Sequence, residues 1–121
     1  MPRVLLSLAL VSCLALTACG GDSDSSSSSD APATPQTGTV DVGMNRLEFD
    51  PVDVTVKTGA KIVWTNLENV PHDVTAEEGA EFKSKVFGQD ETFEYTTEKA
   101  GEIAYTCTLH PGMDGAITVV D

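Results

Sequence analysis

Apolar residues recur at every second position over much of residues 38–121, and turn-forming residues interrupt the runs. A period of two predicts strands with one buried face, because successive side chains of a strand point to opposite sides. The predicted inward positions are Val40, Val42, Val52, Val54, Val56, Ile62, Trp64, Phe93, Tyr95, Ile103, Tyr105, Ile117 and Val119. Short strands separated by Gly, Pro, Asp and Asn predict an all-β sandwich or barrel.

The strand pattern is weakest at residues 77–90, EEGAEFKSKVFGQD, where neither a helical nor a strand period holds. We expect a loop or an irregular strand there. Met44 is assigned to packing in the core. About 84 residues must supply that core, which is near the size at which a bound metal often contributes to stability.

The first 18 residues have a different character, since Arg3 precedes an apolar run from Val4 to Leu16 and small residues lie just before Cys19. This is the layout of a secretory signal peptide. The run is shorter than the roughly 20 residues that span a bilayer, so an uncleaved anchor helix is the weaker interpretation.

The tetrapeptide LTAC at residues 16–19 resembles the bacterial lipobox, in which the cysteine is acylated and becomes the mature N-terminus. The resemblance implies that a lipid on Cys19 is the only attachment to the membrane. The alternative is ordinary cleavage near Ala18 that leaves Cys19 as a plain thiol.

Residues 19–37 contain many serines and no large apolar side chain, so they cannot bury enough surface to offset the entropy of ordering. We expect a flexible tether. The chain therefore divides into a lipoprotein signal peptide (1–18), a lipidated Ser-rich tether (19–37) and a folded domain (38–121). We expect an exported protein that faces the periplasm or the cell exterior.

Cys107 is the one cysteine left in the folded domain, because Cys13 lies in the signal peptide and Cys19 is the predicted lipidation site. It has no partner for an intramolecular disulfide, so it is either buried and inert or committed to chemistry. Counting by twos from Ile103 and Tyr105 directs its sulfur into the fold.

The segment CTLHPGM, residues 107–113, places Cys107, His110 and Met113 three positions apart in a loop that contains Pro and Gly. The other histidine, His72, shares a strand face with Val74 and can also point inward. One thiolate, two imidazoles and a weak thioether are the ligands of electron-transfer copper. Zinc can use the same residues, but the affinity order and the thioether favour copper.

Taken singly, each ligand has a simpler interpretation: a hydrogen-bonded or surface histidine, or a methionine used in packing. Their joint occurrence is what indicates a metal site, since both histidines of the chain and its spare cysteine fall where one site can use them all.

The segments WTNLENVPHDV (64–74) and EKAGEIAYTCTLHPGMDGAITVV (98–120) resemble plastocyanin-like cupredoxins, and the spacing of the 107–113 loop is most similar to that of amicyanins. The resemblance covers essentially the whole domain. It implies a Greek-key β-sandwich of about eight strands that holds one type 1 copper cycling between Cu(I) and Cu(II). It also implies one-electron transfer between protein redox partners, with no enzymatic activity.

The resemblance also assigns residues outside the ligand set. Asp73 stands where the family usually has asparagine, a residue beside the ligands that ties the two ligand loops together, with Thr108 as its donor. The carboxylate should favour Cu(II) and lower the reduction potential. His110 is the implied electron exit, surrounded by Leu109 and Pro111. Leu109 replaces a proline that is common in amicyanins, which leaves the rigidity of the loop open.

Acidic residues dominate the chain after Cys19, where nineteen Asp and Glu against six Lys and Arg give a net charge of −13. This charge excludes nucleic acid as a partner. Two groups, Glu77, Glu78 and Glu81 together with Asp90, Glu91 and Glu94, suggest an acidic face that steers a basic redox partner. The alternative is an ordinary solvated surface. We expect a monomer.

Other functions remain in competition. A copper chaperone or storage lipoprotein can use the same ligands but would exchange its metal readily. A copper oxidase or nitrite reductase needs further histidines for a second metal site. A haem carrier would need a cysteine pair followed by histidine, which does not occur. A structural sandwich domain would leave Cys107 unexplained.

Overall fold

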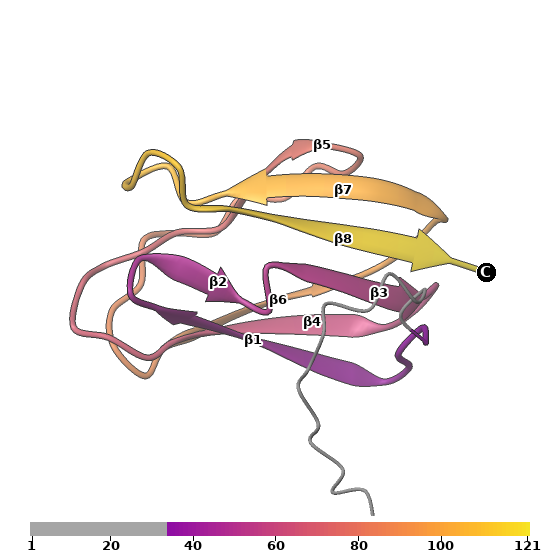
Figure 1. The fold of residues 1–121 in the computed structure, drawn as a ribbon, viewed down its shortest axis with the longest axis horizontal. Coiled ribbons are helices and arrows are strands. Elements are labelled where there is room, and N and C mark those ends of the chain that lie inside the picture. The colour runs from indigo at the N-terminus through magenta and orange to yellow at the C-terminus, as the bar shows by residue number, and fades with distance from the viewer. Residues whose placement is uncertain (1–33) are drawn as a thin grey trace, which may run out of the picture. The chain divides into compact units, whose positions relative to one another are not determined.

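The computed structural model describes residues 34–121, which form eight strands in two four-stranded sheets. The strands are β1 (Thr39–Asn45), β2 (Glu48–Asp50), β3 (Asp53–Lys57), β4 (Lys61–Asn66), β5 (Thr75–Glu78), β6 (Thr92–Thr96), β7 (Gly101–Thr106) and β8 (Asp114–Val120). One sheet has the order β2-β1-β4-β6 and the other β3-β8-β7-β5. The sheets stack as two layers (Figure 1), which confirms the predicted all-β Greek-key sandwich.

Two pairs of strands run parallel, β1 with β4 and β3 with β8, and the remaining pairs are antiparallel. The loop that follows β4 and the loop between β7 and β8 reach the same end of the sandwich (Figure 1). The C-terminus and the start of β1 lie at the opposite end. We call the end that carries the loop after β4 and the β7–β8 loop the loop end.

The core between the sheets is centred on aromatic side chains. Trp64 on β4 and Tyr105 on β7 are fully buried, and their rings meet edge to face with centroids 5.3 Å apart. Phe49 packs against Tyr105 from β2, at 4.8 Å. Met44 is also fully buried, in agreement with its assignment to packing.

The predicted inward faces are correct for most strands, with one exception. Val52 is 50% exposed, because β3 begins only at Asp53 and Val52 belongs to the preceding turn. Phe93 and Tyr95 lie on an edge strand and are half-buried against the core. In residues 77–90, β5 ends at Glu78 and the rest carries only isolated bridges, as the weak pattern predicts.

Backbone pairing begins before β1. Gln36 forms a parallel bridge with Val56, in which its amide donates to Thr55 and its carbonyl accepts from Lys57. The predicted signal peptide and Cys19, with most of the predicted tether, lie outside the described residues. Within residues 34–121, no helix is both long and apolar enough to span a membrane.

Candidate metal centre

His72 is placed by the loop that follows β4. Its backbone forms a two-way bridge with Phe87, with N···O distances of 3.1 and 2.9 Å, and its side chain is fully buried. Asn66, the last residue of β4, stabilises this loop because its amide group donates to the carbonyls of Val70 and Phe87. The position of His72 is therefore fixed by its own backbone bridge to Phe87 and by the hydrogen bonds of Asn66 within the loop.

Cys107, His110 and Met113 are placed by the short loop between β7 and β8. The loop is closed by backbone hydrogen bonds from Cys107 to Met113, from His110 to Cys107 and from Met113 to His110. Gly112 has a φ of 85°, a conformation that is strained for other residues. Cys107 and Met113 are buried and His110 is half-buried.

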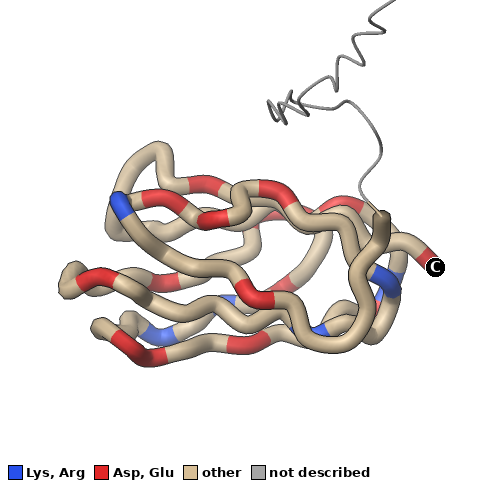
Figure 2. Tube along the Cα trace, turned by 60° about the horizontal axis from the view of Figure 1, so that its bottom comes forward, with Lys and Arg blue, Asp and Glu red and all other residues tan. Residues whose placement is uncertain are grey.

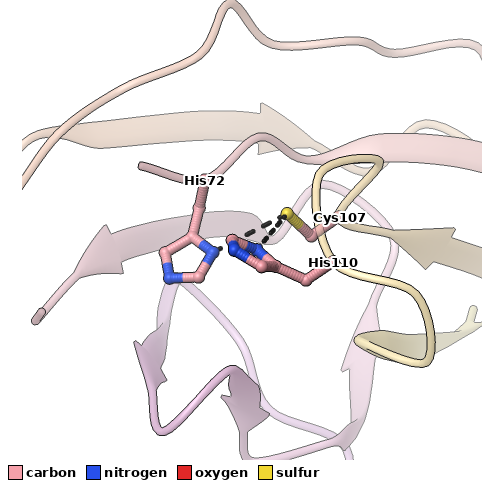
Figure 3. A group of neighbouring side chains, drawn as sticks. All are labelled: His72, Cys107 and His110. Carbon is pink, nitrogen blue, oxygen red and sulfur yellow. Dashed lines mark hydrogen bonds between the residues drawn. The ribbon is translucent and has the colours of Figure 1, made fainter. Parts of the chain in front are cut away.

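The two loops bring three metal-binding side chains together (Figure 3). The candidate ligand atoms of His72, Cys107 and His110 lie within 4.8 Å of one another. The Sγ of Cys107 is 3.6 Å from Nδ1 of His72 and 3.5 Å from Nδ1 of His110. Three donors from two distant parts of the sequence therefore converge on one point.

The orientation of His72 follows from its outer nitrogen. Nε2 lies 2.7 Å from Oε1 of Glu68, and a carboxylate only accepts hydrogen bonds, so Nε2 carries the hydrogen. Nδ1 then presents its lone pair toward the sulfur of Cys107. Burial by itself raises the pKa of Glu68, but hydrogen bonds from the Leu47 amide and His72 outweigh this and leave the pKa below its ordinary value.

Asp73 links the two ligand loops. One oxygen accepts a hydrogen bond from the Thr108 amide, and the other accepts from the hydroxyls of Thr108 and Thr75. Burial raises the pKa of the Cys107 thiol; backbone hydrogen bonds from Asp73 and Leu109 oppose the shift, and the Asp73 side chain adds to it through a hydrogen bond and its negative charge. The metal-free thiol is therefore protonated at neutral pH, and a cation must displace its proton.

The donor set fits copper. One soft sulfur and two imidazole nitrogens that lie close together are the donor types that would hold a type 1 copper, to which a thioether would add a weak contact. Met113 is in the same closed loop and is 1% exposed, and its role as a ligand stays a prediction. Sequence reasoning did not identify Asn66 or Glu68, because an amide and a carboxylate in a polar loop give no distinguishing pattern.

Comparison with known proteins agrees with this chemistry. Residues 36–120 match the family of copper binding proteins described as plastocyanin/azurin, and the chain therefore belongs to this family. Amicyanin-alpha of Methylorubrum extorquens is 31% identical over 94 residues, 74% of this chain and 76% of the relative. Amicyanin of Paracoccus versutus is 32% identical over 82 residues, and this chain spans 62% of its length.

Solved structures of copper proteins also resemble this chain. The crystal structure of Paracoccus versutus amicyanin matches with a TM-score of 0.63 and 32% identity, over 75% of this chain and 86% of that one. A copper-containing nitrite reductase from Thermus scotoductus also matches, with a TM-score of 0.63 and 25% identity, but the match covers only 23% of its chain. The fold is thus that of the copper-binding sandwich domains.

Proposed function

We propose that this protein carries single electrons through one type 1 copper held by His72, Cys107, His110 and Met113. The convergence of three donors in a buried site at the loop end is the observation that supports this most strongly. Copper bound there would supply a one-electron couple. The backbone hydrogen bonds of His72 and Cys107 hold two of the ligands in place, which limits movement between oxidation states.

His110 is the proposed electron exit. It is half-buried, whereas His72 has no exposed surface, so His110 is the ligand that a partner can approach. Leu109 beside it is 43% exposed, and Pro111 is exposed as well. An apolar collar around this ligand permits close and brief docking, because few charged groups must lose water.

A basic redox partner is proposed from the charge. Acidic positions outnumber basic ones along the trace (Figure 2). Five of them, together with the single basic residue Lys99, line a hollow of about 770 Å³, which we call the acidic hollow: Glu77, Glu78, Glu81, Glu98 and Glu102. Asp90, Glu91 and Glu94 are not part of its lining, and Glu94 is 3.6 Å from Lys61. The hollow lies beside the start of β7, whereas Cys107 follows the end of β7, so its charge would act on a partner through the long-range field rather than by docking beside His110. Such steering should make transfer slower as salt increases.

The salt effect can be assigned to the hollow by substitution. Glu78→Gln and Glu102→Gln should each reduce the dependence of the second-order transfer rate on ionic strength, measured with a basic redox protein. Asp41→Asn removes an exposed charge on β1 and is the matched control. Equal salt dependence in all four proteins would leave the hollow as an ordinary solvated surface.

Lipidation of Cys19 would hold the domain at a membrane by the tether alone. The described chain enters the sandwich at the end opposite the loop end (Figure 1). Mass spectrometry of the native protein tests this part, because an unmodified Cys19 would exclude the lipid anchor.

A carrier is distinguished from a copper chaperone or storage protein by how firmly it retains the metal. With ligands held by two hydrogen-bonded loops, we expect copper to stay bound against a moderate chelator in both oxidation states. Rapid transfer of copper to the chelator would favour the chaperone. We propose no enzymatic activity, since both histidines of the chain serve one site and none is left for a second metal.

A further inference from the structure

Glu68 is held by three donors from two different segments. Its carboxylate accepts hydrogen bonds from the backbone amides of Arg46 and Leu47, each at 3.1 Å, and from Nε2 of His72 at 2.7 Å. Its own amide donates to Oδ1 of Asn66 at 3.0 Å. A glutamate on an open surface keeps its rotamer freedom in water, whereas the side chain of Glu68 is held in one conformation.

The segment that holds Glu68 is the tight turn between β1 and β2. Arg46 and Leu47 have φ angles of 57° and 60°, in the left-handed region that side chains other than glycine rarely adopt. Turns of this kind normally use Asn-Gly. The conformation directs two successive amides at one carboxylate, which is the geometry of a backbone anion nest.

We infer that Glu68 is a positioning residue for the ligand His72 and that the β1–β2 turn is shaped to hold it. The inference rests on the proposed copper site. An ionised acceptor on Nε2 fixes the tautomer and the ring orientation, and it makes Nδ1 a stronger donor to a metal. A stronger donor favours Cu(II) over Cu(I), so Glu68 lowers the reduction potential of the site.

The arrangement is specific to one of the two histidines. Among residues 34–121, Nε2 of His110 makes no hydrogen bond in the structure, and that ring is half-buried. The loop that carries Glu68 is also tied to β1, since the Leu67 amide donates to the Met44 carbonyl at 2.9 Å. The ring orientation of His72 is thus fixed by the fold, while Nε2 of His110 has no such partner among the described residues.

The test compares Glu68→Gln with the unmodified full chain, both loaded with copper. Glutamine has nearly the same shape and can still accept a hydrogen bond, but it lacks the charge. We expect the Cu(II)/Cu(I) equilibrium to shift about tenfold toward Cu(I), or about 59 mV in the potential of a one-electron couple. Asp41→Asn, which removes one exposed negative charge from β1, should shift it much less.

A second measurement uses the unmodified protein, so it does not require that any variant folds. In the Cu(I) form of the unmodified protein, the hydrogen on Nε2 of His72 should exchange slowly with water and be visible by ¹⁵N NMR. Rapid exchange, or a Glu68→Gln potential equal to that of the control, would overturn the inference. If either result is found in a protein that still shows the blue copper–thiolate band, only the role of Glu68 is refuted. If the unmodified chain lacks that band, the proposed function itself is refuted.

Discussion

The carboxylate of Asp73 accepts hydrogen bonds from both the amide and the hydroxyl of Thr108, at 2.7 and 2.8 Å. It thereby joins the loop that carries His72 to the loop that carries Cys107. Burial by itself raises the pKa of Asp73, but the hydrogen bonds from Thr108 and Thr75 outweigh it, so the pKa lies below its ordinary value. An ionised carboxylate therefore sits beside the metal ligands at neutral pH.

Asp73→Asn should raise the reduction potential of the copper. The change removes a negative charge that favours Cu(II), and a shift of about 59 mV would correspond to a tenfold change in the one-electron equilibrium. Cyclic voltammetry of the two proteins measures it. Identical potentials would mean that the charge of Asp73 is fully compensated by its hydrogen-bond donors.

Leu109→Glu should slow electron transfer more than it changes the potential. Leu109 is exposed next to His110, so a charged side chain there obstructs the proposed docking surface without touching the ligands. Stopped-flow transfer rates and voltammetry on the same samples separate the two effects. A large change in potential with an unchanged rate would exclude this exit route.

Gly115→Ala should destabilise the fold. A Cβ at Gly115 would lie 2.4 Å from Cζ and 2.5 Å from the hydroxyl oxygen of Tyr105, whose ring is fully buried and cannot move aside. We expect a loss of about 1–3 kcal/mol in the free energy of unfolding, measured by denaturant titration. Gly88→Ala is the control, because its Cβ would meet only Glu91 at 3.6 Å.

Stability should fall as the pH rises from about 10 to about 12. Burial raises the pKa of Tyr105 to about 12 from an ordinary value of 10. Over that interval the unfolded chain binds fewer protons than the folded one at this group, so the free energy of unfolding decreases with pH, by roughly 3 kcal/mol in total. Tyr105→Phe should lose this part of the pH dependence; an unchanged profile would contradict the assignment to Tyr105.

Much of the fold follows from the alternation of apolar residues, because a strand with one buried face must repeat every second residue. The same count directs Cys107 inward, and the close spacing of Cys107, His110 and Met113 already indicates a common loop. His72 was identifiable because one remaining histidine had to complete the set. These features are local, so a sequence displays them directly.

The features that the sequence did not reveal depend on contacts between distant segments. The parallel pairing of β1 with β4 has no local signal, and neither has the bridge from Gln36 to Val56. Glu68 was missed for the same reason, since its role depends on a turn some twenty residues upstream. Val52 was assigned to the core because alternation alone does not tell where a strand begins.

The central claim is that Cys107 binds copper together with two histidines. The most direct test is the visible absorption spectrum of the full chain after one equivalent of Cu(II), with and without Cys107→Ser. We predict an intense blue copper–thiolate band that disappears on reduction and is absent from the variant. Copper that binds without this band, or a band that survives in Cys107→Ser, would contradict the account.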